Sequence, residues 1–268
     1  MKKLALLVCI ATMAIGVNVY ALDFGDNITI FDKNGSGSDW YGTQEDQEVE
    51  PGMQRLQKWD LEGFFQDDDK LTMVGGYNFV TGATASYGQL MSGDIFIDVD
   101  GDAQYGDIHG TSKGIKVVQE RNGYDFVLDM HFDTLTYNVL QLTDHSRTQT
   151  SYEKQNQGSN PWRYYDGGID LGISGNIEYL GDLSHADTGF TGKYHNAATV
   201  DLGFLSEIDL SGYTLAETFT THFTMECGND NLMGSFDPTS PVPEPSTVLL
   251  LGAGLLGLVG YGKSRRKK

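Results

Sequence analysis

The sequence predicts an all-β ectodomain, an antiparallel β-sandwich that is jelly-roll-like. Apolar and polar residues alternate with a period of two in several short segments, which is typical of strands with one buried face. Glycine is abundant, with 34 among 268 residues. Gly, Asn and Asp cluster between the alternating segments as turn residues. The sequence contains no convincing amphipathic helix longer than two turns.

The clearest expected strands are the segments 125–132 and 219–225. In the first, Phe126 and Leu128 fall on one face, and Asp129 and His131 fall on the other. Shorter expected strands are Ile28–Phe31, Leu71–Val74, Ile95–Val99, Ile115–Val118 and Val200–Phe204. Turns are expected at Gly75-Gly76, Asn122-Gly123, Gly167-Gly168 and Gly228-Asn229-Asp230, since such residues separate strands and Asn-Gly favours a hairpin.

Residues 1–21 are expected to be a secretory signal peptide. Lys2 and Lys3 precede an apolar run over residues 4–17, which ends in Val19-Tyr20-Ala21. A basic start, a short apolar stretch and a small residue at the exit define such a signal. We expect cleavage after Ala21 and export of the chain.

Three consecutive segments form the C-terminal end. Residues 237–246 are a proline-rich linker, which should be extended because proline fixes φ and lacks a donor. Residues 247–262 are expected to form a transmembrane helix, and residues 263–268 a basic cytoplasmic tail. Its apolar run, residues 247–261, gives about 22 Å of helix against a hydrocarbon core of about 30 Å, which favours a temporary anchor.

Between these ends lies an acidic ectodomain, residues 22–236. Counted to residue 242, it has 11 Lys and Arg (18 minus seven in the two ends) and 36 Asp and Glu (37 minus Glu244), so its net charge is −25. This charge argues against binding to nucleic acid or anionic lipid, because both require positive charge. It favours solubility and the attraction of cations.

Cys227 is the one cysteine of the ectodomain, so an intrachain disulfide is not expected there. Stability in an oxidising compartment must then come from a hydrophobic core, for which about 200 residues suffice. The free thiol leaves open an intermolecular disulfide.

The C-terminal end resembles a PEP-CTERM sorting signal. The resemblance rests on Val242-Pro243-Glu244-Pro245-Ser246-Thr247, the apolar run that follows, and the basic end. It implies recognition by exosortase, a membrane enzyme that removes the tail near the motif, in Gram-negative bacteria that make extracellular polysaccharide. By position, Pro243, Glu244 and Pro245 form the recognition element. Ectodomain segments such as Trp59-Asp60-Leu61-Glu62-Gly63-Phe64 are similar to segments in other PEP-CTERM cargo proteins, without a known activity.

A calcium site is the first candidate in the ectodomain. Asp98, Asp100 and Asp102, with Asp107, place carboxylates at alternate positions just after an expected strand. Calcium takes several oxygen ligands at once, so these side chains could converge on it. The spacing differs from an EF-hand, and Asp-Gly is also an ordinary turn, so both interpretations stay open.

A sugar-binding site is the second candidate. Trp162, Tyr164 and Tyr165 lie in one aromatic loop, and exposed rings on a β-sandwich can stack on sugars, although core packing is commoner.

Catalysis is not expected. The segment 207–211 resembles the catalytic strand of jelly-roll glucanases, but Ser211 and Gly212 stand where its second glutamate belongs. We therefore expect a surface strand there.

These observations predict a non-enzymatic protein of the cell surface or extracellular matrix. It would be anchored by its C-terminal helix before processing, and then have a structural or adhesive role in the envelope or an exopolysaccharide biofilm. The alternative is a calcium-assisted, lectin-like carbohydrate-binding module. The expected partners are exosortase, the membrane and extracellular polysaccharide.

Overall fold

The computed structural model describes residues 21–31, 45–47, 49, 53–54, 56–103, 115–152 and 159–237. Ala21, the expected cleavage position, is the first of them and is exposed. The rest of the expected signal peptide lies outside the described residues, as do the C-terminal helix, the basic tail and the linker after Asp237. Within the part of the chain that is described, no helix is both long enough and apolar enough to cross a membrane.

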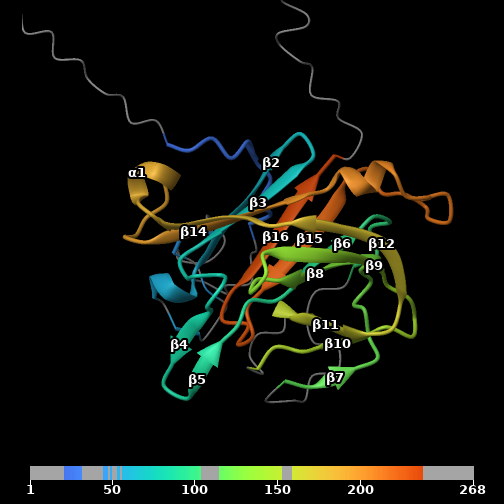
Figure 1. The fold of residues 1–268 in the computed structure, drawn as a ribbon, viewed down its shortest axis with the longest axis horizontal. Coiled ribbons are helices and arrows are strands. Elements are labelled where there is room, and N and C mark those ends of the chain that lie inside the picture. Colours follow the sequence, from blue (N-terminus) through green and yellow to red (C-terminus); the bar gives the residue numbers. More distant parts are fainter. Residues whose placement is uncertain are drawn as a thin grey trace, which may run out of the picture.

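Two antiparallel sheets form the body of the molecule (Figure 1). The five-stranded sheet has the order β1-β2-β3-β14-β13, with β1 (Asp26–Asn27), β2 (Leu61–Asp67), β3 (Lys70–Gly75), β14 (His195–Asp201) and β13 (Glu178–Leu183). The six-stranded sheet has the order β12-β9-β8-β6-β15-β16, with β12 (Ile169–Asn176), β9 (Thr136–Gln141), β8 (Phe126–His131), β6 (Ile95–Asp98), β15 (Phe219–Thr224) and β16 (Asn231–Phe236). The predicted all-β antiparallel sandwich is confirmed.

Strand β8 shows how the alternating sequence builds the core. Phe126, Leu128 and Met130 belong to the main cluster, to which strands of both sheets contribute. Val127 points the other way and is also buried, in a second cluster against which Tyr164 packs. A third sheet therefore covers part of the outer face of the six-stranded sheet; its strands are β11 (Arg163–Asp166), β10 (Arg147–Gln149) and β7 (Val117–Val118).

The sandwich is connected along both sides. On one side, β12 leads through Ile177 directly into β13, so the chain passes from one sheet to the other. On the other side, the Ile28 N–H donates to the Phe64 carbonyl of β2 at 3.0 Å, and the Ile30 N–H donates to the Met233 carbonyl of β16 at 2.8 Å. The hydrogen bonds of Ile28 and Ile30 thus pair backbone groups of β2 and β16 that would otherwise lie open at this side.

One end of the sandwich carries the small hairpin of β4 (Ala83–Ala85) and β5 (Gly88–Leu90), beside the 3₁₀ helix η1 (Gln57–Trp59). Strand β16 starts near this end and finishes at the opposite end, running from the lower to the upper part of Figure 1. A strand of this length spans about 20 Å. The chain beyond Asp237 therefore continues from the end opposite the β4–β5 hairpin.

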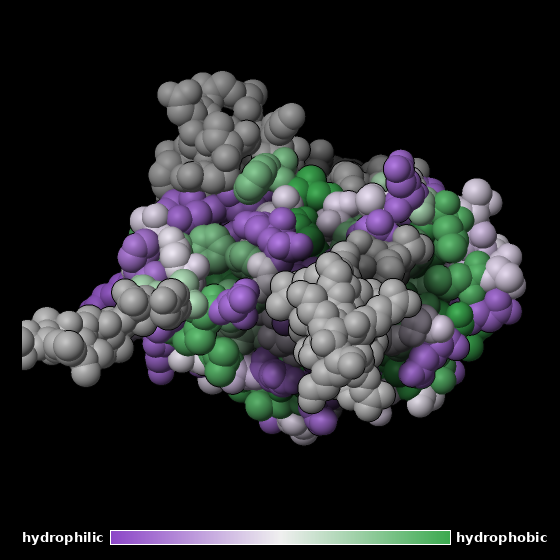
Figure 2. Space-filling model, turned by 90° about the horizontal axis from the view of Figure 1, so that it is seen from above, coloured by the Kyte–Doolittle hydropathy of each residue, from purple (hydrophilic) through white to green (hydrophobic). Residues whose placement is uncertain are grey.

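The surface is mixed in character. Seen from above in the orientation of Figure 1, hydrophilic and hydrophobic side chains are interspersed over the coloured part of the face (Figure 2). This agrees with a solvated, strongly charged ectodomain.

Two expected strands have other bounds than predicted. Strand β14 ends at Asp201, and the 3₁₀ helix η3 (Gly203–Ser206) replaces the rest of the expected strand up to Phe204. The Asp201 carboxylate accepts a hydrogen bond from the Gly203 N–H at 2.8 Å, which starts a local turn in place of the sheet ladder. Ile115 lies before β7, which has only two residues.

Candidate functional site

The acidic loop after β6 is the predicted calcium site. Carboxylate oxygens of Asp98, Asp100 and Asp102 lie within 4.8 Å of one another, and Asp107 lies outside the described residues. The Asp98 carboxylate is turned toward its own loop: it accepts hydrogen bonds from the N–H groups of Asp100 at 3.1 Å, Gly101 at 2.8 Å and Ala103 at 3.1 Å. These bonds give the loop its turn conformation. Calcium binding here stays a prediction.

Electrostatic repulsion is present in this loop. Burial raises the pKa of Asp102, and the charges of Asp100 and Asp98 raise it further. Burial also raises the pKa of the nearby Asp125 to about 6, although its carboxylate accepts hydrogen bonds from the Val99 N–H at 2.9 Å and from the Arg121 guanidinium at 3.0 Å. A cation bound at the loop would relieve this repulsion and compete with protons.

The three predicted sugar-binding aromatics do not form one platform. Trp162 is only 5% exposed, so its ring belongs to the interior. Tyr164 is half-buried and its hydroxyl donates to the Gly167 carbonyl at 2.6 Å. Tyr165 is 49% exposed, and the Arg147 guanidinium lies 5.0 Å from its ring centroid. Tyr165 alone of the three presents an open ring.

The segment around Glu207 and Asp209 is not the surface strand that the sequence predicts. Glu207 caps the C-terminal end of η3, and the Asp209 carboxylate accepts a hydrogen bond from the Ser211 N–H at 2.9 Å. This local hydrogen bond favours a turn over a strand. The two carboxylates therefore do not line a sheet as a glucanase strand requires.

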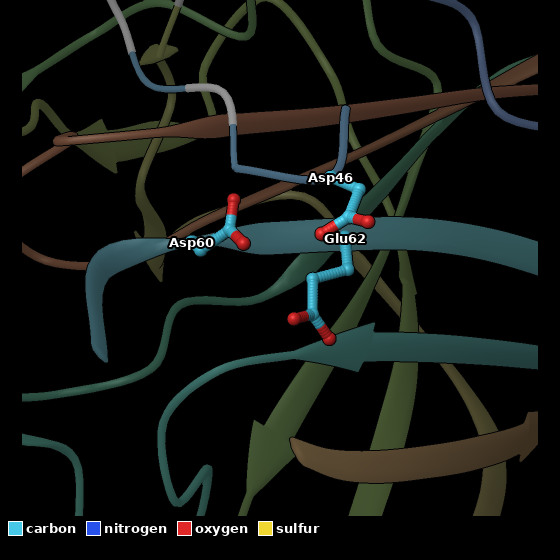
Figure 3. Close-up of side chains that lie close together, drawn as sticks. All are labelled: Asp46, Asp60 and Glu62. Atoms are coloured by element: carbon cyan, nitrogen blue, oxygen red, sulfur yellow. The ribbon is translucent and has the colours of Figure 1, made fainter. Parts of the chain in front are cut away.

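A second acidic cluster, which the sequence analysis missed, lies at the start of β2. Asp60 and Glu62 flank Leu61, and Asp46 comes from a separate segment that crosses over this strand (Figure 3). Carboxylate oxygens of the three residues lie within 4.8 Å of one another. Asp60 and Glu62 are each only 1% exposed. Burial of several carboxylates is unfavourable unless hydrogen bonds, protons or a cation compensate them.

Two glutamine side chains hold this cluster together. The Gln47 side-chain amide donates to Gln57 Oε1 at 2.8 Å and to the Thr191 backbone carbonyl at 2.9 Å. The Gln57 amide donates to Glu62 Oε1 at 2.5 Å, and the Gln47 backbone N–H donates to Asp60 Oδ2 at 3.0 Å. The carboxylates are thus fixed by a network that spans η1, β2 and the segment before β14.

Glu62 of β2 pairs with His195, the first residue of β14, which lies on the other side of β3 in the five-stranded sheet. His195 Nδ1 lies 2.7 and 2.8 Å from the two Glu62 carboxylate oxygens, and both side chains are fully buried. Glu62 lies in an irregularity of β2 between Leu61 and Gly63, which changes the direction of its side chain. Burial raises the pKa of Glu62, while its hydrogen bond to His195 opposes this rise.

The chemical capacity of this cluster follows from its donors. Carboxylate oxygens beside an imidazole could hold a divalent cation, or they could share protons. The sequence does contain a hint of this cluster, because the acidic residues Asp60 and Glu62 stand at the start of a strand that is otherwise mostly apolar. Asp46 and His195, which complete the cluster, are far from Glu62 in the sequence, so that signal alone does not assemble the site.

Cys227 is 3% exposed, which keeps its thiol from forming a disulfide with another chain unless the fold opens.

Comparison with known proteins identifies one region of the chain. The family model described as "PEP-CTERM protein-sorting motif" matches residues 241–267, which include Pro243, Glu244 and Pro245. No curated protein and no solved structure shows significant similarity to the chain. The resemblance of the ectodomain to other cargo proteins therefore stays a prediction. The match confirms the sorting signal predicted from the sequence, and the chain is an exported protein that carries a PEP-CTERM protein-sorting motif and is processed through exosortase.

Proposed function

We propose that the ectodomain acts outside the cell as a non-enzymatic structural or adhesive protein of the envelope or of an exopolysaccharide matrix. The observation that carries this proposal is the PEP-CTERM motif at residues 241–267, joined to an acidic β-sandwich. The motif directs the chain to the cell surface, and the high negative charge suits a soluble, well-hydrated component.

The placement of Glu207 and Asp209 supports a role without catalysis. They lie at a 3₁₀-helix end and in a turn, away from the facing arrangement that glycoside hydrolysis needs. Hydrolysis of extracellular polysaccharide that is lost in the Glu207→Gln variant would contradict the proposal.

A deletion strain of the native host tests the structural or adhesive role. We expect its matrix to be less cohesive under shear, and the wild-type gene to restore cohesion. A gene carrying Pro243→Ala, Glu244→Ala and Pro245→Ala is the matched control and should not restore it. A deletion strain with unchanged matrix cohesion and surface attachment would contradict the proposal.

Calcium-assisted carbohydrate binding is a second candidate, favoured by the convergence of Asp98, Asp100 and Asp102. Calcium at 1 mM would raise the melting temperature of the purified protein, and a chelator would reverse the rise, because a ligand that binds only the folded state stabilises it. The Asp100→Asn variant should lose the effect, and Asp133→Asn should keep it. An identical melting temperature with and without calcium would exclude this candidate.

A further inference from the structure

A cavity of about 330 Å³ opens between η1, the β4–β5 hairpin and the turn before β16. Trp59 and Leu90 form part of its buried wall, and Lys58, Ser86 and Tyr87 form part of its exposed rim. Apolar walls with a few polar groups at this size are typical of small-ligand sites. No acidic residue is among the described residues that line it, although acids outnumber bases 37 to 18 in the chain. The cavity thus suits a neutral or anionic ligand.

Tyr87 lines this cavity, and its ring is stacked on that of a second exposed tyrosine, Tyr152. Tyr87, at the tip of the β4–β5 hairpin, is 61% exposed, and Tyr152 is 40% exposed. Their rings are stacked, with centroids 5.8 Å apart and planes 24° apart. A sugar ring has a face rich in C–H groups that packs on an aromatic ring, while its hydroxyl groups stay free to bind polar groups. The stacked pair offers such a surface with little loss of side-chain freedom on binding.

The polar groups at the cavity are held in place before any ligand arrives. Lys58 Nζ donates to the Thr84 carbonyl at 2.9 Å and lies 4.4 Å from the centroid of the Trp59 ring. The backbone of Gln54 is fixed by Asn229, whose amide accepts from the Gln54 N–H and donates to the Gln54 carbonyl, both at 3.1 Å. An ammonium group and an amide-bearing residue are therefore preorganised beside the aromatic surface.

The cavity lies at the end of the sandwich opposite the point where the C-terminal segment begins. Asn229, which lines it, precedes β16, whereas the chain leaves β16 at Phe236, at the opposite end (Figure 1). While the C-terminal segment holds the protein at the membrane, the sandwich separates the cavity from the point at which that segment begins. The cavity stays accessible to large extracellular molecules.

We propose that this cavity binds a sugar unit of an extracellular polysaccharide. The Tyr87 ring, held by its stacking on Tyr152, packs on the sugar ring, and Lys58 favours a sugar that carries a carboxylate. The proposal rests on the proposed function outside the cell, and it names a site different from the loop that contains Tyr165.

The test is a binding titration of the purified full chain in detergent. The probes are an alginate hexasaccharide, which is acidic, and cellohexaose, which is neutral, together with exopolysaccharide purified from the native host. We expect binding of the host polysaccharide or of a defined probe, with alginate preferred over cellohexaose. Tyr87→Ala and Tyr152→Ala should each weaken binding by about tenfold. Tyr194→Ala removes a ring of similar exposure that is not among the residues lining the cavity, and it should leave the affinity unchanged.

A change in tryptophan fluorescence on adding the probe is a second readout, because Trp59 lines the cavity. An unchanged melting temperature shows that each variant is folded. Binding of none of the probes would overturn the proposal, as would equal affinity of the wild type and Tyr87→Ala, or loss of binding in Tyr194→Ala alone. Failure of the proposed matrix function would be seen in a different assay, the cohesion of the matrix in the deletion strain. A protein that strengthens the matrix but binds no probe contradicts the cavity proposal alone.

Discussion

Asp94 gives the ectodomain a stability that depends on pH. Its side chain is buried, with 1% of the residue exposed, where the third sheet meets β8. Its carboxylate oxygens accept hydrogen bonds from the Met130 N–H at 2.9 Å and the Tyr164 N–H at 2.7 Å. Burial, together with the neighbouring charge of Asp129, raises the pKa of Asp94 to about 8.

The sign and size of the effect follow from proton binding. The folded protein keeps the Asp94 proton up to about pH 8, whereas the unfolded chain releases it near 3.8. Because the folded state binds more protons in this window, the free energy of unfolding falls as the pH rises. The slope is at most about 1.4 kcal/mol per pH unit, so raising the pH from 6.5 to 8 costs about 2 kcal/mol, or about 4–8 °C in melting temperature.

The window above pH 6.5 separates Asp94 from two other buried groups with shifted pKa values. Burial raises the pKa of Asp125 only to about 6, and it lowers the pKa of His222 to about 4. Both groups have largely finished titrating in the folded state above pH 6.5. The unfolded chain still releases about half a proton from His222 above pH 6.5, which offsets the fall in stability by only about 0.4 kcal/mol. The pKa of Glu62 is also raised, so any contribution from it has the same sign as that of Asp94.

Urea unfolding followed by tryptophan fluorescence at pH 6.5 and pH 8 measures this difference. Asp94→Asn should flatten most of the dependence, at a constant cost of about 1–3 kcal/mol because the amide cannot accept both hydrogen bonds. Asp133→Asn, at an exposed position, is the matched control and should keep the dependence. A wild-type protein that is equally stable at both pH values, or a variant Asp94→Asn with the full slope, would refute the reasoning.

Further predictions concern packing and a buried histidine. A Cβ atom on Gly76 would lie 1.8 Å from the Gln57 backbone carbonyl oxygen. Gly76→Ala should therefore destabilise the protein by about 3 kcal/mol or more in the same urea assay. Gly212 has open space around it, so Gly212→Ala should change stability by less than about 1 kcal/mol. His222 is fully buried and its Nε2 lies 3.0 Å from the Pro161 carbonyl, so its ring should stay neutral down to about pH 4 in an NMR titration; a midpoint near 6.5 would contradict this burial.

Strands whose one face packs on the core were the part of the fold that the sequence predicts best. Phe126, Leu128 and Met130 stand at alternate positions because one side of β8 lies in the main cluster. Strands β12 and β13 were not predicted, since most of their residues are partly or fully exposed and the apolar alternation is weak. The local turn that ends β14 depends on Asp201 accepting a hydrogen bond, which a count of apolar residues does not detect.

The candidate sites also differ in how far the sequence predicts them. The sorting motif lies in one contiguous stretch, and the order of its three parts was sufficient to predict it. The cluster of Asp46, Asp60 and Glu62 with His195 depends on the pairing of distant strands, which local sequence patterns do not determine. The cavity at Tyr87 likewise needs η1, a hairpin and the turn before β16 to meet.

The central claim is that the ectodomain acts outside the cell after its tail has been processed. Intact mass and cell fractionation, made on the protein from its native host, test this claim most directly. The comparison is between the wild type and a variant with Pro243→Ala, Glu244→Ala and Pro245→Ala. We predict that the wild type loses both ends and appears at the surface or in the matrix, while the variant stays longer and membrane-bound. If both proteins keep the segment after Asp237 and remain in the membrane, the account is contradicted, and the tail is a permanent anchor.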